Sequence, residues 1–327
     1  MVIAVDAVGG DHYPKNPVSG GIQALNEMPE LKLLFVGPES LIKEELARHE
    51  YDSARVDILH APEIISMQDS ASAVLKEKKN SSITLGLQSH KAGDCHGFVS
   101  AGHTGALLTA STVFLGKIEG VYRPTIAAIF PTINGVRILI DAGANLTLKE
   151  EMYYQFAVMG KIFTEEILKV DNPKIGLLNV GEESEKGTEL LKASYLKLKE
   201  LDNFVGNIEG KDILNAKADV FLTDGFTGNI LLKFGESIPD VMQKMVKEQL
   251  DLISADSDLQ KQVFQILTKA MHTFDYEQIG GVPFLGVNGV SFVGHGNSSV
   301  LAIKNMIKSA MQCVDHEVNK KIKASLN

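Results

Sequence analysis

Four apolar, strand-like segments of this sequence end in turns that combine glycine with Ser, Asn or Asp. The clearest is 98–111, where an apolar pair precedes Ser100–Gly105 and a helical spacing of apolar residues follows. The others are 138–145, 175–183 and 220–229. A strand, a glycine turn and a helix in succession can point free backbone N–H groups at an anion. We therefore expect an α/β protein whose strand ends converge on one anion-binding cleft.

The N-terminal residues support this fold class because strands and helices alternate there. Apolar strands are expected at 2–5, 31–36 and 56–59, an alternation typical of a parallel sheet flanked by helices. Asn134-Gly135, between apolar runs, predicts an antiparallel hairpin. Further patterns predict two helical stretches in 70–92, helices at 150–168, 188–198 and 297–322, strands at 174–180 and 219–223, and two short strands within 283–293.

From Ser237 onward the pattern changes to two amphipathic helices. Apolar residues recur at three- and four-residue spacing in 238–253 and again in 259–271, and residues 254–258 between them supply N-caps. Few strands are close enough to cover both apolar faces. We therefore expect one α/β domain over 1–327, with a protruding helical hairpin at 237–275 that serves a dimer or a membrane surface.

Composition excludes several classes of function. The net charge of −9 argues against nucleic acid as the main partner, because a phosphate backbone requires a basic face. Cys95 and Cys313 fit no zinc or redox spacing, so a reduced cytoplasmic chain is expected. No apolar run approaches the roughly 20 residues of a membrane-spanning helix, and the N-terminus lacks signal-peptide features. Any membrane contact is expected to be peripheral.

The familiar catalytic motifs are missing from the sequence. Gly181–Gly187 is not a Walker loop, no Gly-x-Ser-x-Gly elbow occurs, and no dinucleotide fingerprint follows the first strand. The histidines form no metal cluster, so neither metal nor cofactor is predicted. An exposed acidic loop or a simple helix cap would also explain several of the turns. Taken together, glycine turns, amides and a few cations suit anionic oxygens better than covalent catalysis.

These motifs closely resemble the phosphate acyltransferase family of bacterial phospholipid synthesis (acyl-acyl-carrier-protein:phosphate acyltransferase). The family usually has Met where Val8 stands and Asn where His103 stands; His can donate a hydrogen bond as Asn does, but it can also carry charge. The matching segments, in family order, are Ala4–His12, Ser100–Ala106, Arg123-Pro124, Asp141–Asn145, Leu178–Glu183 with Lys186-Gly187, Val205–Gly210, Asp224–Asn229, Leu285–Gly289 and His295-Gly296.

The resemblance implies transfer of a long-chain acyl group from acyl carrier protein to inorganic phosphate. The acyl phosphate product would supply phospholipid synthesis, so the acyl-phosphate:glycerol-3-phosphate acyltransferase is a candidate partner. The resemblance also implies a Rossmann-like, layered α/β/α fold similar to the isocitrate and isopropylmalate dehydrogenases and to phosphotransacetylase. It further implies a homodimer in the cytoplasm that associates weakly and peripherally with the inner face of the cell membrane.

Phosphate is already a nucleophile, so the predicted site needs orientation and charge rather than a strong base. We expect Lys186 to supply charge to phosphate or to the oxyanion. Asn229 and His103 would donate hydrogen bonds, and Asp224 would hold these groups in place. The predicted substrate-binding residues are Gly9, Gly10, Asp11, Ser100, Gly102, Thr104, Gly105, Arg123, Asp141, Asn145, Asn179, Gly181, Glu182, Glu183, Gly225, Gly228 and Lys233.

Three other functions stay open on the sequence. One is a phosphotransacetylase-like transfer from acyl-coenzyme A to phosphate, which preference for a carrier-linked thioester would distinguish. A decarboxylating dehydrogenase-like enzyme would need a nicotinamide site and an acidic metal cluster. A non-catalytic regulator that senses phosphate or the acyl carrier is the third.

Overall fold

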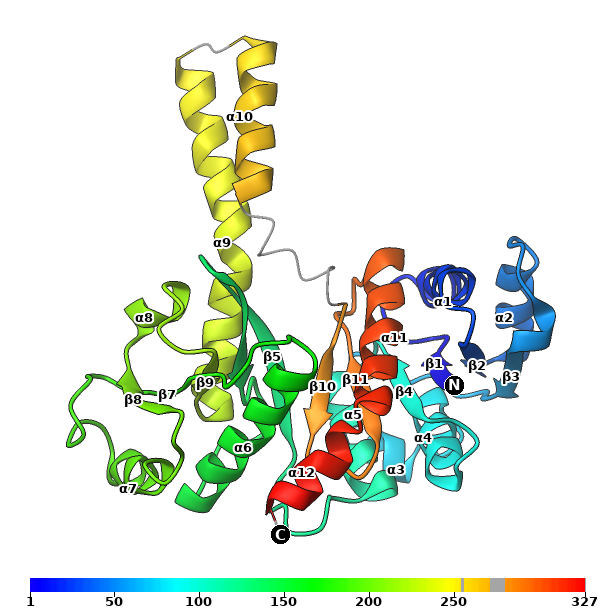
Figure 1. Cartoon of the computed structure of the whole chain (residues 1–327). Coiled ribbons are helices and arrows are strands. Elements are labelled where there is room, and N and C mark those ends of the chain that lie inside the picture. The colour runs from blue at the N-terminus through cyan, green and yellow to red at the C-terminus, as the bar shows by residue number, and fades with distance from the viewer. Residues whose placement is uncertain (254–255, 271–279, 327) are drawn as a thin grey trace.

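The computed structural model describes residues 1–253, 256–270 and 280–326. Within these residues, strands of both halves of the chain form one 11-stranded mixed sheet in the order β3-β2-β1-β4-β11-β10-β5-β6-β9-β7-β8 (Figure 1). The strands are β1 Val2–Asp6, β2 Lys32–Gly37, β3 Val56–His60, β4 Gly97–Ser100, β5 Thr125–Thr132, β6 Gly135–Ile140, β7 Ile175–Leu178, β8 Phe204–Ile208, β9 Val220–Leu222, β10 Val282–Leu285 and β11 Val290–Val293.

Helices cover the sheet and extend beyond it (Figure 1). They are α1 Lys15–Glu27, α2 Glu39–Leu46, α3 Ala73–Lys76, α4 Ser82–Ala92, α5 Thr104–Ala110, α6 Glu150–Glu166, α7 Glu189–Leu198, α8 Gly210–Leu214, α9 Gly225–Leu252, α10 Ser257–Ala270, α11 Val300–Asp315 and α12 Val318–Leu326. A π-helix, Ser111–Leu115, continues α5.

Successive residues of the strands pack into two separate hydrophobic cores. In β1, Ile3 and Val5 belong to the core that α1, α6 and α11 cover, whereas Ala4 belongs to the core that α4 and α5 cover. In β9, Val220 belongs to the first of these cores and Phe221 to the second. This alternation follows from the two-residue period of a strand and makes the fold a mixed α/β sheet with helical layers on both faces.

Most of the predicted elements are confirmed. Ile133 and Asn134 form the turn between β5 and β6, Gly135 begins β6, and the predicted antiparallel hairpin is confirmed. β10 and β11 are the two short strands predicted within 283–293. The N-terminal alternation forms the parallel run β3-β2-β1-β4. The sheet as a whole is not parallel, because β10 and β5 interrupt it with antiparallel pairings.

Three predictions about elements need correction. The strand β8 and the short helix α8 were not predicted, since glycine and polar residues interrupt the apolar run of this segment. The predicted helix at 297–322 is two helices, because Glu317 adopts a left-handed φ of 53° between α11 and α12. The helix expected from Ser237 is the second half of α9, which runs unbroken from Gly225 with Pro239 inside it.

Helices α9 and α10 contact each other and project away from the sheet (Figure 1). Asp256 accepts hydrogen bonds from the backbone N–H groups of Asp258 and Leu259, at 3.0 and 2.8 Å, and so caps α10 as its sequence position predicts. No described residue of α10 is buried. The predicted segment 237–275 also includes 271–275, which lie outside the described residues.

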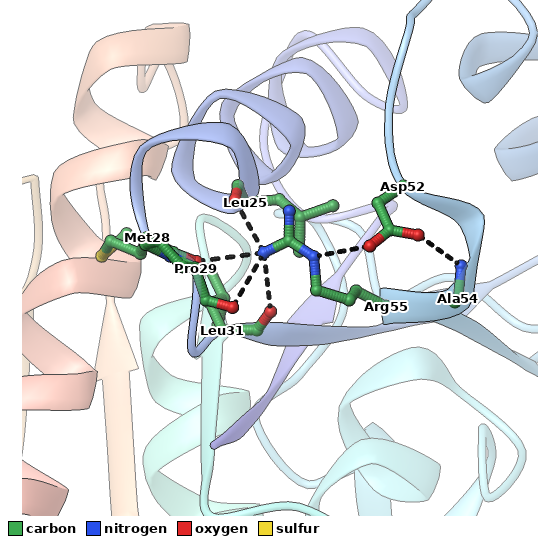
Figure 2. A network of polar contacts seen from close by, with 7 residues as sticks. All are labelled: Leu25, Met28, Pro29, Leu31, Asp52, Ala54 and Arg55. Atoms are coloured by element: carbon green, nitrogen blue, oxygen red, sulfur yellow. Dashed lines mark hydrogen bonds and ion pairs between the residues drawn. The ribbon is translucent and has the colours of Figure 1, made fainter.

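Arg55, directly before β3, forms hydrogen bonds that connect this part of the chain to the end of α1. Its Nε donates to Asp52 at 3.1 Å, and Figure 2 shows the guanidinium group surrounded by backbone carbonyl groups. Its Nη1 lies within hydrogen-bonding distance, 3.0 to 3.4 Å, of the carbonyl oxygens of Leu25, Met28, Pro29 and Leu31. One cation thereby contacts four carbonyl groups at and just beyond the C-terminal end of α1, where helical carbonyl groups lack intrahelical partners.

We predict that Arg55→Ala lowers the free energy of unfolding by about 2–3 kcal/mol, the usual range for hydrogen bonds to a charged group. Urea denaturation of the purified protein would measure this change. Arg48→Ala is the matched control, because the Arg48 side chain is exposed and pairs with the exposed Glu44 and with the buried Glu45, which also contacts His49; its cost should stay below about 1 kcal/mol. Equal effects of the two variants would contradict the fastening role of Arg55.

Candidate active site

Three of the four predicted turns begin at one edge of the sheet. The last residues of β6, β9 and β7 lie side by side, with Ile140 opposite Leu222 and Leu177 also opposite Leu222. Neighbouring strands are about 4.8 Å apart, so the turns that start at Asp141, Asn179 and Asp224 are close neighbours. This edge is therefore the centre of the candidate site.

The turn at Asp141 is built around its own carboxylate. Asp141 accepts hydrogen bonds from the backbone N–H groups of Gly143, Ala144 and Asn145, the shortest being 2.7 Å. It also accepts one from the Asn145 side chain at 2.9 Å. Because this carboxylate already occupies the amides, the turn positions Asn145 rather than offering an empty anion cradle.

The N-terminus of α9 packs directly on that turn. The N–H group of Gly225 donates to the Asn145 carbonyl oxygen at 2.8 Å, and Asp224 caps the helix by accepting from Phe226 and Thr227, both at 2.9 Å. A Cβ atom at Gly228 would lie 2.0 Å from the Asp141 carbonyl oxygen, so only glycine allows this approach. The first amides of α9 are therefore used within the protein.

Burial changes the protonation of groups beside these turns. It raises the pKa of Asp141 to about 6, although the hydrogen bonds from Asn145, Ala144 and Gly143 act in the opposite direction. Burial, followed by the charges of Asp224 and Asp141, raises the pKa of Tyr153 on α6. The site therefore places a carboxyl group with a raised pKa beside a tyrosine that stays protonated at neutral pH.

Two amide side chains hold the loop that carries Lys186. Asn179 donates to the Lys186 carbonyl oxygen at 3.1 Å, and Asn207 of β8 donates to the Glu183 carbonyl oxygen at 2.8 Å. Gly187 has a φ of 88° and lies against the Asn179 side chain. The Lys186 side chain itself is exposed and passes over Gly181. In the described part of the chain, its ammonium group has no hydrogen bond or ion pair.

The fourth turn belongs to a second group of residues. Ser100 donates to the buried carboxylate of Asp6 at 2.6 Å and accepts from the Gly102 N–H group at 3.0 Å. Gly9 packs against these atoms, and the Asp11 N–H group donates to the Gly296 carbonyl oxygen at 2.6 Å. Burial raises the pKa of Asp6. The Ser100 turn, the Gly9–Asp11 turn and the loop after β11 thus form one hydrogen-bonded unit.

The four strand ends do not all lie at one edge of the sheet, and their convergence on one cleft stays a prediction. Three antiparallel pairings, β11–β10, β10–β5 and β5–β6, separate β4 from β6, so these two strands run in opposite directions. Helix α9 connects the two groups of turns. Glu236, three turns into α9, has a carboxylate oxygen 3.2 Å from the His295 ring of the loop after β11.

A cavity of about 540 Å³ also lies between the two halves. Asn145 is on its wall and donates to the Pro124 carbonyl oxygen at 2.9 Å. In the described residues, Arg123 on the same wall has no hydrogen bond or ion pair. The other lining residues are Leu108, Thr109, Thr112, Val113, Lys117, Tyr122, Pro124 and Ala144. A second hollow, of about 570 Å³, is lined by α10 residues alone and is remote from the turns.

Glu182, Glu209 and Asp212 form an acidic cluster beside the Lys186 loop, with their oxygen atoms within 4.8 Å of one another. Lys217 neutralises part of it through ion pairs of 2.9 Å with Glu182 and 3.3 Å with Asp212. Lys211 pairs with Glu209. These pairs indicate a salt-bridged surface network, which gives Glu182 a structural role besides its predicted contact with substrate.

The structure therefore divides the predicted site residues into two main groups. The first group surrounds the edge formed by β6, β9 and β7: Asp141, Asn145, Asn179, Gly181, Glu182, Glu183, Lys186, Asp224, Gly225, Gly228 and Asn229. The second surrounds the ends of β1 and β4: Gly9, Gly10, Asp11, Ser100, Gly102, His103, Thr104 and Gly105.

Several residues depart from their expected surroundings or were not predicted. His103 accepts a hydrogen bond from the Ala106 N–H group at 3.2 Å and so caps α5. Lys233 is exposed on α9, one turn before Glu236 and on the same flank. Asn207 and Tyr153 were not predicted as individual residues of the site. Only the family segment 205–210 includes Asn207, and Tyr153 lies within an ordinary amphipathic helix.

Comparison with known proteins places the chain in a family. Residues 1–321 match the family described as "Fatty acid synthesis protein". A curated relative from Salinibacter ruber, named phosphate acyltransferase, is 46% identical over 312 residues, which cover 94% of this chain and 92% of the relative. The predicted resemblance is therefore confirmed over nearly the full length.

Solved structures share the fold at much lower sequence identity. A phosphotransacetylase from Streptococcus pyogenes aligns with a TM-score of 0.62 and 15% identity, covering 96% of this chain and 94% of the other. A putative 4-hydroxythreonine-4-phosphate dehydrogenase from Salmonella typhimurium aligns with a TM-score of 0.54 and 12% identity, covering 95% and 98%. The fold is thus common to both kinds of protein, whereas sequence identity gives the family. This chain belongs to the phosphate acyltransferase family.

Proposed function

We propose that this protein transfers a long-chain acyl group from acyl carrier protein to inorganic phosphate and releases acyl phosphate. The observation that supports this most directly is the 46% identity to a phosphate acyltransferase over 94% of the chain. The site is compatible with the reaction because Lys186 and Arg123 can supply positive charge. The neighbouring turns are already held in place by hydrogen bonds within the protein.

Phosphate attacks the carbonyl carbon of the thioester, and the pantetheine thiolate leaves. A free thiol has a pKa of about 8.5, so the thiolate is a good leaving group and needs little acid catalysis. The protein must bring two anionic or polar reactants together and stabilise the tetrahedral oxyanion. Lys186 would supply charge to phosphate or to the oxyanion, and Asn229 would donate a hydrogen bond. Asp224 and Asp141 would keep α9 and Asn145 in position.

A single-turnover assay tests this proposal. Purified protein, a long-chain acyl carrier protein and phosphate should yield acyl phosphate without added metal or nucleotide. Acyl-coenzyme A in parallel distinguishes the phosphotransacetylase-like alternative, and absorbance of a nicotinamide cofactor tests the dehydrogenase-like one. No acyl phosphate from a carrier shown to be acylated would refute the proposal.

The specific likeness of the fold to isocitrate and isopropylmalate dehydrogenases stays a prediction.

We also propose a homodimer formed through α9. Its outer face carries large apolar side chains that are each at least half exposed: Phe226, Ile230, Phe234, Val241 and Met245. Their spacing places them along one side of the helix. A continuous apolar stripe of this length is unusual on a monomer, and a second copy of α9 and α10 could cover it as in a four-helix arrangement.

In the described residues, no helix is long and apolar enough to cross a membrane. We propose instead that the far end of α9 contacts the membrane surface weakly. Leu252 and Ile253 are 76% and 67% exposed there, and the nearby Asp251, Asp256 and Asp258 disfavour strong attraction to anionic lipid.

We predict that the double variant Leu252→Asp, Ile253→Asp no longer co-sediments with liposomes, because burial of these two side chains would drive the binding. The dimer and its activity in solution should remain. Ile133→Asp is the control, since Ile133 is 74% exposed on the β5–β6 turn; that variant should sediment as the wild type does. Dissociation of the double variant into monomers would instead assign these residues to the dimer interface.

A further inference from the structure

The cavity between α5 and the Asp141–Asn145 turn has exposed apolar side chains on and beside its lining. Val113 and Tyr122 line this cavity and are 56% and 52% exposed. Leu146, directly after Asn145, is 71% exposed. Exposed aromatic and aliphatic side chains around a cavity are typical of the central part of a protein interface.

Three cations accompany these apolar side chains: Lys117 and Arg123 line the cavity, and Lys91 of α4 contacts the loop 115–123. The Lys91 ammonium group donates to the Leu115 carbonyl oxygen at 3.5 Å, and the Lys117 ammonium group donates to the Tyr122 carbonyl oxygen at 2.9 Å. Arg123 follows in the chain. Their side chains are exposed, and the two lysines bind only uncharged backbone oxygens through these contacts. Their charge is therefore available to a partner.

Within the described residues, no carboxylate forms an ion pair with Lys91, Lys117 or Arg123. Glu119, in the same loop, is paired with Lys323 of α12 at 3.0 Å. The whole chain carries a net charge of −9, so an uncompensated cationic rim is a local exception. Such a rim attracts an acidic surface and steers its approach, whereas a second copy of this acidic chain lacks overall charge complementarity.

We propose that this face, which consists of Lys91, Val113, Lys117, Tyr122, Arg123 and Leu146, docks the acidic surface of the carrier protein that delivers the acyl thioester. This inference rests on the proposed function and assigns the place where its protein substrate binds. The carrier would sit over the mouth of the cavity, so that its pantetheine arm enters toward Asn145 and the edge formed by β6, β9 and β7. The cationic rim would bind the acidic surface, and the three apolar side chains would be covered.

The double variant Lys91→Glu, Leu146→Asp tests the docking face without altering a residue that lines the cavity. Its matched control is Lys199→Glu, Leu196→Asp, in which Lys199 is an exposed lysine and Leu196 is 69% exposed on α7. Both variants change the net charge equally. The measurements are the Kd of acyl carrier protein, from fluorescence anisotropy, and kcat/KM with two donors, acyl carrier protein and acyl-pantetheine.

The docking-face variant should bind the carrier roughly tenfold or more weakly, and its kcat/KM with the carrier should fall through KM. Its turnover of acyl-pantetheine should equal that of the wild type, and the control variant should be unchanged with both donors. Added salt should weaken carrier binding to the wild type more than to the docking-face variant.

Two results would overturn the inference. Unchanged carrier affinity in the docking-face variant would show that the carrier binds elsewhere. An equal loss of activity with both donors would assign these residues to the chemistry or the fold instead of to carrier docking. Failure of the proposed function is a different result, in which the wild type transfers acyl groups from neither donor; carrier affinity would still decide where the carrier binds.

Discussion

Replacing Lys186 with alanine should lower acyl phosphate formation by roughly a hundred- to a thousandfold, the usual effect of removing one preorganised electrostatic donor. We expect this loss because the loop is held by its backbone and leaves the Lys186 ammonium group available. Two amides, Asn179 and Asn207, hold the loop by its backbone at 3.1 and 2.8 Å, and the ammonium group has no partner in the described residues. The loop therefore keeps its shape without the charge. Initial rates of acyl phosphate formation would measure the loss.

A measurement of the free energy of unfolding distinguishes loss of the Lys186 charge from a folding defect in the variant. Lys186 is exposed, so its removal should change the free energy of unfolding by no more than about 0.5 kcal/mol. Lys199→Ala is the control, since Lys199 is an exposed lysine at the end of α7 and away from the turn. Wild-type turnover in the Lys186 variant would leave this residue as a solvated surface charge.

Much of the fold could be predicted because strand and helix periods are local properties of the sequence. The β5–β6 hairpin follows from Asn134-Gly135, and the cap of α10 follows from Asp256. The order and direction of the strands could not be derived in this way. The choice of β10 and β5 as antiparallel partners joins segments more than a hundred residues apart, and no local pattern fixes it.

The local turns of the site could be predicted from the sequence, but the contacts between them could not. Glycine turns correctly indicated crowded strand ends, but sequence could not show what fills each turn. At Asp141 the carboxylate occupies the amides of its own turn, and Asp224 does the same at the start of α9. The polar contact between Glu236 and His295 joins residues from two different segments, so only the fold reveals it. The catalytic roles assigned to the predicted residues stay predictions.

Gly228→Ala should disrupt the site more severely than any surface substitution. The added Cβ atom would lie 2.0 Å from the Asp141 carbonyl oxygen and 2.8 Å from the Thr223 side chain, and the first of these neighbours is backbone that cannot rotate away. Either α9 or the Asp141–Asn145 turn must move. We expect a loss of about 3 kcal/mol or more of stability, typical of strong overpacking, and acyl phosphate formation reduced at least a hundredfold, since misplacement by about 1 Å can cost that much.

Gly210→Ala provides the matched control for this prediction. Gly210 also begins a helix, α8, but a Cβ atom there would meet nothing within 4 Å. The same substitution should therefore be neutral or stabilise the protein by up to about 1 kcal/mol, because alanine restricts the unfolded chain. Thermal and urea unfolding of both variants, with initial rates measured well below the transition, would compare them. Near-wild-type stability and activity for Gly228→Ala would mean that α9 does not need its close contact with Asp141, and the packing argument for the site would fail.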